Sequence, residues 1–464
     1  MSRESRIAIV PSAGRLMSSL RDIGYDLPSA VADLVDNAID ASSSTVNVDV
    51  VADGSESWIR VSDDGIGMSA ARLDEAMRYG TRVDYSPEAL GRYGLGLKTA
   101  SLSQCRRLTI ASRERGASKR AIRRWDLDEV LRRDTWELER LSHRAASERL
   151  TGPIAETGHG TVVLWEHLDR VLPRRPTEGM TARVLRTAVD EIRDHLAMVF
   201  HRFLDETAYD GRGRLVLTLN GDRIEAWDPF ARHEQHTRTL PRQVLEYQDS
   251  EGRTVAVDVQ PYVLPSQQLF SSPEAHQAAA GPRRWNRHQG FYIYRRDRLI
   301  QPGGWNRLRT LDEHAKLARI AVDLPLGEEQ GFGVDVAKMR VSIPDELRPA
   351  LRTVASGVVA VAQERYRDHL DAIDPGLKEQ PFRAAPEAIS ISRDWPAIIA
   401  ALDDVLGHDP YLRDTVLLRL ANADPDDSAH VNDARTKRQA RHASGVITGG
   451  SSNHEGQPVA EHLT

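Results

Sequence analysis

The sequence predicts an α+β protein, in which two domains of mixed helices and strands are followed by a helical C-terminal region. Residues 1–170 alternate helical and strand patterns, residues 171–206 carry apolar positions at helical spacing, and strand patterns return over residues 207–344. From 345 to 424 the pattern is helical again. Residues 425–464 are rich in Ser, Gly, Asp, His and Asn and have few large apolar side chains, so we expect a disordered tail.

The composition restricts the class of protein. The chain has 464 residues, enough for more than one domain, and its formal net charge of -6 excludes a uniformly basic nucleic-acid coat. The one cysteine, Cys105, excludes an internal disulfide framework and a multi-cysteine metal site. The N-terminus lacks the apolar core of a signal peptide, and no segment approaches the roughly 20 apolar residues of a membrane span. We therefore expect a soluble, cytoplasmic protein without membrane contact.

The first domain contains four predicted strands. Residues 44–53 and 57–65 alternate apolar and polar side chains, and Gly and Asp residues between them indicate a hairpin turn. Residues 106–114 and 159–168 show the same kind of pattern. An antiparallel sheet with helices on one face is the natural packing for these elements.

Strand patterns also define the second domain, and helical patterns lie on either side of it. Apolar residues at Ile192, Leu196, Val199 and Phe203 predict a connecting helix before this domain. A possible cap and an acid pair at 345–346 open a helix after it. The predicted strands lie within residues 214–230, 254–265, 290–300, 318–326 and 340–344.

The stretch Val31–Ala41 has an unusual distribution of charge for a helix. Its apolar side chains fall on one face at helical spacing, and Asp33, Asp36, Asn37 and Asp40 gather on the other. No Lys or Arg lies within a turn, and like charges three or four residues apart cost about 0.2–0.5 kcal/mol per pair. Two interpretations stay open: a solvated helix start, where acids are favourable, or a divalent-cation site with a carboxylate left for base chemistry.

Two glycine-containing motifs follow this helix. Asp63 ends a strand and precedes Gly65 and Gly67, so a fixed carboxylate lies beside backbone that a flat ligand can approach closely. Residues 91–101, "GRYGLGLKTAS", place three glycines before a helical run, as in phosphate-binding loops. The second motif matches neither the Walker pattern nor the dinucleotide fingerprint. Each motif alone is also compatible with an ordinary turn.

The acid and Asn helix, the Asp-x-Gly-x-Gly turn, the glycine-rich segment and "HGTVVLW" at 159–165 occur in a characteristic order. In order and spacing they closely resemble the GHKL ATPase superfamily, which comprises gyrase, the ninety-kilodalton heat-shock chaperone, histidine kinases and MutL. The resemblance covers residues 1–170 directly. It implies a Bergerat-type ATPase domain, with helices on one face of a mixed, mainly antiparallel sheet, and the cofactors ATP and Mg²⁺.

The resemblance also assigns roles to individual residues. It implies that Asn37 coordinates Mg²⁺ on the phosphates, that Asp63 accepts a hydrogen bond from the adenine amine, and that Thr161 supports adenine through water. Glycines of the lid would wrap the phosphates. A phosphate contact by Lys98 competes with the reading of a solvated lysine at a helix start. The other expected nucleotide contacts are Gly65, Gly67, Met68, Gly91, Gly94, Leu95, Gly96 and Thr99.

One position departs from the family pattern. The hydrolytic base of the superfamily is usually a Glu four residues before the Asn, and here that position is Asp33. The shorter side chain withdraws the carboxylate by about 1.5 Å, one C–C bond. A base has to lie within about 2.6–3.2 Å of the proton that it takes, or act through a water. We therefore expect ATP binding with slow hydrolysis, unless the backbone compensates.

The second domain distinguishes the branches of the superfamily. A histidine kinase is disfavoured, because no His precedes the motif helix. Gyrase, MutL and MORC proteins instead carry a transducer domain whose lysine reaches the terminal phosphate, and Lys338 occupies that place here. Residues 207–344 resemble, more loosely, the transducer segments of MORC-like ATPases and of their bacterial MutL-related relatives. A surface lysine in a loop is the alternative for Lys338.

The resemblance implies an ATP-gated homodimeric clamp. We expect it to act on DNA, in DNA processing or in antiviral, restriction-type defence, with separate nuclease or helicase subunits. Arginines interleaved with aromatic residues at 283–298 and a basic cluster at 435–442 are compatible with DNA, and equally with a solvated hairpin and a solubilising end. The alternatives are a chaperone-like ATPase that acts on protein clients and an ATP-sensing scaffold with little hydrolysis.

Overall fold

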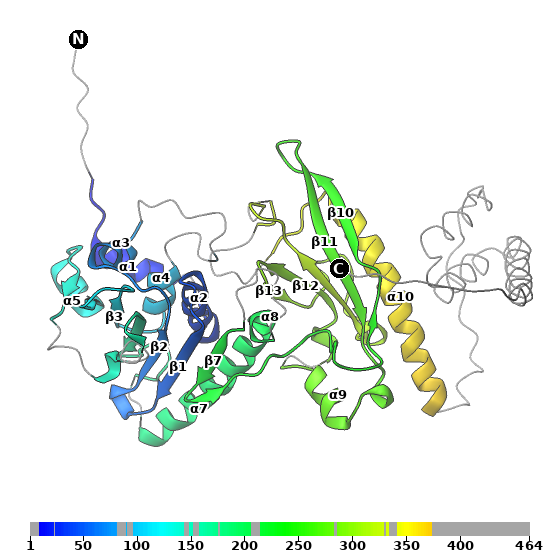
Figure 1. Ribbon diagram of the computed structural model, residues 1–464, viewed down its shortest axis with the longest axis horizontal. Coiled ribbons are helices and arrows are strands. Elements are labelled where there is room, and N and C mark those ends of the chain that lie inside the picture. Colours follow the sequence, from blue (N-terminus) through cyan, green and yellow to red (C-terminus); the bar gives the residue numbers. More distant parts are fainter. Residues whose placement is uncertain are drawn as a thin grey trace, which may run out of the picture. The chain divides into compact units, whose positions relative to one another are not determined.

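The protein is described here from a computed structural model (Figure 1). It describes residues 9–22, 24–80, 90, 96–142, 148–151, 157–174, 177–205, 214–282, 285–328, 331–333 and 341–373. The chain divides into two compact units, Met1–Lys378 and Glu379–Thr464, and all of these residues belong to the first. Within the described ranges, no helix has the length and apolarity needed to cross a membrane. The predicted tail at 425–464 lies outside them.

The first sheet has eight strands in the order β5-β4-β3-β6-β2-β1-β7-β8. Its strand pairs are antiparallel except for β1 and β7, which run parallel, so the sheet is mixed and mainly antiparallel as predicted. The strands are β1 Thr45–Val51, β2 Trp58–Asp63, β3 Arg107–Arg113, β4 Ala121–Asp126, β5 Glu139–Arg140, β6 Gly160–Glu166, β7 Val216–Leu219 and β8 Asp222–Arg223.

Helices pack on one face of this sheet. Alternate strand residues, such as Val46, Val48 and Val61, share one buried cluster with apolar residues of the helices. The opposite alternation, including Val162 and Leu164, forms a separate small cluster. The helices of this part are α1 Ala13–Arg21, α2 Leu27–Asp40, α3 Ala70–Ala76, α4 Gly96–Leu102, α5 Leu127–Arg133, α7 Glu178–Val199 and α8 His201–Leu204, with 3-10 turns at Gly54–Glu56 and Glu148–Leu150.

The second sheet has the order β10-β11-β14-β12-β13, and β9 pairs with β11. β12 and β14 run parallel, and the other pairs are antiparallel. The long helix α10 packs against β11 and β14. The elements are β9 Arg238–Thr239, β10 Gln243–Gln248, β11 Thr254–Val263, α9 Pro273–Ala279, β12 Gly290–Arg295, β13 Arg298–Pro302, β14 Ala318–Asp323 and α10 Arg348–Ile373, with 3-10 turns at Gln267–Leu269, Trp285–Arg287 and Glu313–Ala315.

The sheets divide the chain at a different place from the predicted boundary at residue 207. Residues 214–224 were expected in the second domain, but β7 extends the first sheet by pairing with β1. An alternating pattern identifies a strand without indicating which sheet it joins, and this is the reason for the difference. The predicted strand at 340–344 is also absent over 341–344, which have no regular secondary structure.

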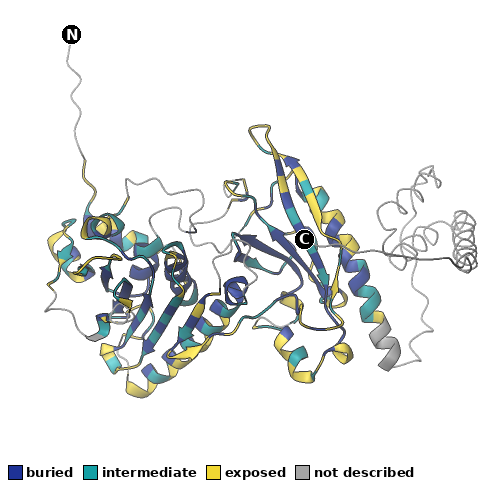
Figure 2. Ribbon diagram, in the orientation of Figure 1, coloured by how far each residue is buried: buried dark blue, intermediate teal, exposed yellow. Residues whose placement is uncertain are grey.

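The connecting helix predicted before the second domain is present as α7 and α8. Ile192, Leu196, Val199 and Phe203 are buried, as their helical spacing predicts. α7 packs against both α2 and β13, so it contacts elements of both parts of the unit. Figure 2 shows buried residues concentrated in the strands and on the helix sides that face them.

His201 of α8 lies fully buried below the second sheet. Its Nε2 is 2.9 Å from the hydroxyl of Tyr294, and among the described residues its Nδ1 has no hydrogen-bond partner. Burial, opposed by Asp228 and assisted by Arg202, lowers the pKa of His201 from its ordinary value of 6.5 to about 3. The imidazole is therefore neutral in the folded protein.

This burial predicts an acid-sensitive fold. As the pH falls below 6.5, unfolded chains bind a proton at His201 and folded chains do not, so stability is lost as the pH falls from about 6.5 toward 3. Between pH 7 and pH 5 the free energy of unfolding should fall by about 2 kcal/mol more in the wild type than in His201→Gln. Denaturant titrations at both pH values measure this difference. The exposed His233 provides the control, His233→Gln, and equal pH slopes for the wild type and His201→Gln would contradict the prediction.

Candidate functional site

The acid face of α2 is divided between the interior and the surface. Asp33 is 3 % exposed and Asp36 is fully buried, whereas Asn37 is exposed and Asp40 is half-buried. A solvated helix start therefore does not describe Asp33 and Asp36. The apolar face that the spacing predicted, with Val31 and Val35, is also buried, so α2 is covered on most of its circumference.

An arginine distant in the sequence is bonded to one of the two buried carboxylates and lies near the other. Arg298, the first residue of β13, places its Nε 2.9 Å from Oδ1 and 2.8 Å from Oδ2 of Asp36. Its Nη2 lies 4.0 Å from Oδ1 of Asp33. The sequence led us to expect Mg²⁺ to offset the repulsion along this stripe, but the cation in contact with the buried acids is this guanidinium. Local sequence windows miss it, because 262 positions separate Asp36 from Arg298.

Asp33 is held by a second partner and faces the start of α4. The hydroxyl of Tyr25 donates to Oδ2 of Asp33 over 2.8 Å. Burial, and next the charge of Asp33, raise the pKa of Tyr25 well above its usual range, so the phenol stays protonated and donates. A Cβ on Gly96 would lie 3.0 Å from the same Oδ2, so the absence of a side chain there leaves space beside the carboxylate.

Asp63 ends β2 as a buried acceptor. Its Oδ1 accepts hydrogen bonds from the backbone N–H of Gly65 over 2.9 Å and from the hydroxyl of Ser43 over 3.2 Å. Burial raises the pKa of Asp63 to about 6, and these hydrogen bonds oppose the increase. Asp63 lies directly opposite Thr161 in the pairing of β2 with β6. The two residues assigned to adenine are therefore neighbours on adjacent strands.

The turn after Asp63 is fixed to strand β3. Gly67 adopts a φ of +68°, and a Cβ there would lie 1.9 Å from the carbonyl oxygen of Arg113. The N–H of Met68 donates to the hydroxyl of Ser112 over 2.8 Å, and that hydroxyl is 2.9 Å from Oγ1 of Thr161. Ser112 therefore connects the turn to Thr161.

The end of α2 is bonded to the same turn. The N–H of Ile66 donates to the carbonyl of Ala41, the C-cap of α2, over 3.0 Å. A Cβ on Gly65 would lie within 2.8 Å of Ala41 atoms. The acid helix and the Asp63 turn are therefore bonded to each other.

The structure directs Lys98 away from solvent. Its Nζ donates to the carbonyl of Ala76 over 2.8 Å and lies 6.0 Å from the ring centre of Tyr79. Burial lowers the pKa of Lys98 to about 8. The alternative of a solvated lysine is therefore incorrect, and a phosphate contact would require the ammonium to leave Ala76. The neighbouring Thr99 is buried and hydrogen-bonds to Tyr25.

Several predicted site residues cannot be placed. Gly91, Gly94, Leu95 and Lys338 lie outside the described residues, so their roles remain predictions. Within the parts of the chain that are described, no three His, Cys, Asp or Glu side chains form a group able to hold a metal ion. A metal held partly by phosphates and waters needs only one or two protein oxygens, so the exposed amide of Asn37 fits the predicted role.

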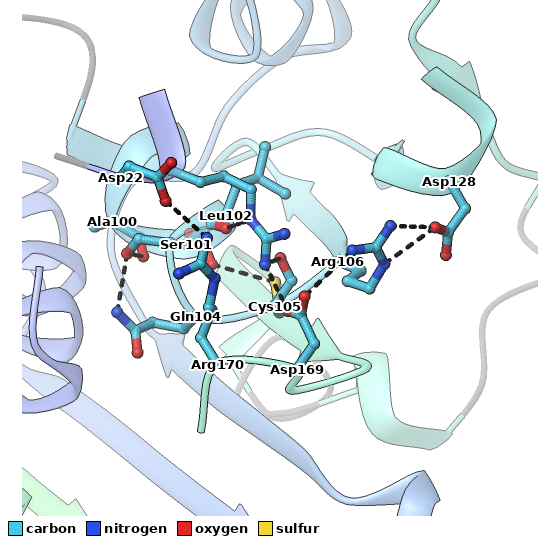
Figure 3. Close-up of polar contacts among 12 residues, drawn as sticks. Asp22, Ala100, Ser101, Leu102, Gln104, Cys105, Arg106, Asp128, Asp169 and Arg170 are labelled. Atoms are coloured by element: carbon cyan, nitrogen blue, oxygen red, sulfur yellow. Dashed lines mark hydrogen bonds and ion pairs between the residues drawn. The ribbon is translucent and has the colours of Figure 1, made fainter. Parts of the chain in front are cut away.

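A charged network behind α4 fixes the helix in place (Figure 3). Arg21 of α1 donates to the carbonyl of Cys105 over 3.3 Å and pairs with Asp169. Arg106 joins Asp169, over 3.2 Å, to Asp128 of α5. Sequence reasoning missed this network, because its members lie in four separate segments without a common motif.

Comparison with known proteins identifies related sequences. Residues 25–161 match the family described as histidine kinase-, DNA gyrase B-, and HSP90-like ATPase. The chain is 34% identical over 88 residues to ATPase morc-1 of Caenorhabditis elegans, covering 19% of this chain and 10% of that protein. It is 42% identical over 93 residues to DNA mismatch repair protein MutL of Paramagnetospirillum magneticum, covering 19% and 15%. With MutL of Agrobacterium fabrum the identity is 32% over 197 residues, covering 42% and 29%. The chain thus spans less than a third of the length of these relatives.

Two glycines with the same backbone conformation provide a test of the turn geometry. Gly67 and Gly80 have φ values of +68° and +69°, but a Cβ on Gly80 would meet no atom of the described residues within 4 Å. Gly80→Ala should cost only the left-handed strain, about 1 kcal/mol. Gly67→Ala should cost at least about 2 kcal/mol more, because its Cβ meets the backbone of Arg113. Denaturant unfolding measures both, and equal costs would show that the turn does not press against β3.

Proposed function

Because residues 25–161 belong to the GHKL superfamily of ATPases, related to those of MORC and MutL proteins, we propose that this chain binds and hydrolyses Mg-ATP. The observation that carries the proposal is the assembly of α2, the turn from Asp63 to Met68, and Thr161. These three elements contain the residues to which the superfamily resemblance assigns nucleotide contacts, and the bonds between Ile66 and Ala41 and between Ser112 and Thr161 hold them together.

The adenine end of the proposed site is at Asp63. An ionised carboxylate can accept a hydrogen bond from the exocyclic amine of adenine. Two donors, Gly65 and Ser43, occupy Oδ1 and orient the group. The turn at Gly67 lies against the backbone of Arg113, and Thr161 supplies a hydroxyl on the neighbouring strand.

The phosphate end is at the exposed side of α2. We propose that Asn37 holds Mg²⁺ through its amide oxygen, together with phosphate oxygens and waters. Bound there, Mg²⁺ neutralises charge on the phosphates. The glycine-rich segment that includes Gly91, Gly94, Leu95 and Gly96 is proposed to supply backbone N–H donors to the phosphates. Lys338 is proposed to contact the terminal phosphate.

Asp33 is the proposed general base. Tyr25 fixes Oδ2, and Gly96 leaves space beside the carboxylate for a water. The carboxylate is one carbon further back than that of the usual Glu, and the surrounding helix is tightly packed. We therefore propose slow turnover.

At the level of the whole chain we propose an ATP-gated homodimer that acts on DNA with separate nuclease or helicase subunits, in DNA processing or defence. The support is the similarity to proteins named for DNA mismatch repair. The basic segment 283–298 adds little, because Arg295 and Arg298 are buried and bonded within the protein. A protein-directed, chaperone-like ATPase and an ATP-sensing scaffold are the competing functions.

ATP turnover by the purified chain, with and without DNA, tests the proposal. Asp33→Asn should retain ATP binding and lower turnover by at least about a hundredfold, because it removes the base. Asn37→Ala should abolish Mg²⁺-dependent ATP binding.

The same assay separates the functions proposed for the whole chain. Turnover stimulated by DNA would favour the DNA-acting clamp, and turnover stimulated by unfolded protein would favour the chaperone-like ATPase. Unaltered hydrolysis in Asp33→Asn would show that Asp33 is not the base, and unchanged affinity in Asn37→Ala would remove the site assignment.

The raised pKa of Asp63 predicts a pH-dependent affinity. Below about pH 6 the carboxyl takes up a proton and loses its charge as an acceptor, so ATP affinity should fall by up to about tenfold per pH unit. Asp63→Asn should bind ATP more weakly at pH 7, and its affinity should not show the fall that protonation of Asp63 causes. Protonation of the nucleotide affects the wild type and the variant equally. Calorimetric titration between about pH 7.5 and pH 5 provides the comparison.

The neighbouring Asp64 supplies the control for that titration. Its carboxylate accepts hydrogen bonds from the backbone of Ser44 and Thr45 and has no assigned nucleotide contact. Asp64→Asn should keep the pH slope of the wild type, with the midpoint moved to lower pH because the charge of Asp64 contributes to the raised pKa of Asp63. Parallel slopes for the wild type and Asp63→Asn would place the titrating group elsewhere.

A further inference from the structure

We infer that Arg298 is a positioning residue for ATP hydrolysis: through the buried acid pair of α2 it makes the geometry at Asp33 depend on the hairpin between β12 and β13. The inference rests on the proposed function. Four observations support it: the contacts of Arg298, a second contact of the same hairpin with α2, the conformation of its turn, and the anchoring of the turn to α8.

The first observation is that one guanidinium serves two carboxylates. Arg298 is 2 % exposed and spans Asp36, at 2.8 and 2.9 Å, and Asp33, at 4.0 Å. Asp33 and Asp36 are three residues apart, so they lie on one side of α2. Removing the guanidinium would take a cation away from two buried like charges, which is strongly unfavourable unless the helix moves or a carboxylate reorients. Either response displaces the proposed base.

The second observation is that the hairpin reaches α2 at another place. Nη1 of Arg295 donates to the carbonyl of Leu90 over 3.1 Å, and the N–H of Leu90 donates to Oδ1 of Asp40 over 2.9 Å. Leu90 is buried, at 1 % exposure. The same turn therefore contacts α2 directly at Asp36 and, through Leu90, one turn later at Asp40.

The third observation is the shape of the turn that presents these arginines. Arg296 and Asp297, the two residues between β12 and β13, have φ values of +49° and +65°. Positive φ at both positions is the pattern of the tight two-residue turn that suits the twist of a hairpin. Arg295 and Arg298 are paired across the strands at its base, so they point to α2 from a short, defined connection.

The fourth observation is that the turn is fixed from the side opposite α2. Nη1 of Arg202, in α8, lies 3.0 Å from Oδ1 of Asp297, and its guanidinium lies 3.5 Å from the ring centre of Tyr294. Arg202 also pairs with Asp323 of β14. The helix α7, which precedes α8, packs on both α2 and β13. The hairpin is therefore connected to α2 on one side and to α7 and α8 on the other. A displacement of the second sheet would thus move Arg298 relative to Asp33.

Steady-state ATP hydrolysis by the full chain tests this inference. Arg298→Gln should lower kcat at least about tenfold and change KM by less than about threefold, because displacement of a reacting group affects the chemical step most. Arg298→Lys, which keeps the charge but loses the paired hydrogen bonds, should restore part of kcat. Arg296→Gln, in the same turn, should match the wild type.

A double variant separates positioning from a merely structural role. Asp36→Asn with Arg298→Gln removes both charges of the pair, so its melting temperature should exceed that of Arg298→Gln alone. The double variant still lacks the guanidinium 4.0 Å from Asp33, so if this contact positions the base, kcat stays low despite the regained stability. Recovery of kcat together with stability would overturn the inference, and so would wild-type kcat in Arg298→Gln. Absence of turnover in the wild type would overturn the proposed function and this inference together.

Discussion

The arrangement of both sheets depends on the buried ion pair between Asp36 and Arg298. A carboxylate removed from water without a partner costs several kcal/mol, and α2 buries two carboxylates within one helical turn. The sequence of α2 itself contains no Lys or Arg. A cation for this pair comes from Arg298 of β13, so burial of the acid helix is coupled to the packing of the second sheet against it. The stability of the first domain and the placement of the second sheet thus both depend on how these buried charges are paired.

The sequence predicted the strands and the apolar side of α2 because both depend on local periodicity. Residues alternating at period two lie in β1, β2, β3 and β6, and the register of β2 with β6 then places Asp63 opposite Thr161. Periodicity does not identify partners, which explains why β7 was assigned to the wrong sheet and why Arg298 was missed. Its position in an arginine-rich hairpin indicated a nucleic-acid surface, and nothing local signalled an inward direction.

The sequence indicated the glycine turn of the candidate site but not the side chains that support it. Glycine spacing identified the Asp63 turn, because a positive φ and a close backbone approach at Gly67 exclude side chains. The supporting groups Tyr25, Ser43 and Ser112 were not found, since single hydroxyl residues occur throughout any sequence and gain meaning only from the atoms that they contact. For Lys98 the local motif was misleading. Its position in a glycine-rich segment indicated a phosphate contact, whereas its buried ammonium donates to the carbonyl of Ala76.

Burial also changes what the arginines imply about DNA. Affinity for a nucleic acid backbone comes from exposed cations that replace its counterions. Arg295 donates to a backbone carbonyl and Arg298 to a carboxylate, and both are nearly inaccessible to solvent. In the described part of segment 283–298, Arg287 is exposed and Arg296 is half-buried. A DNA contact made by this chain must therefore use residues other than the two arginines that connect the hairpin to α2, and substitutions of these arginines would act on the proposed nucleotide site rather than on DNA.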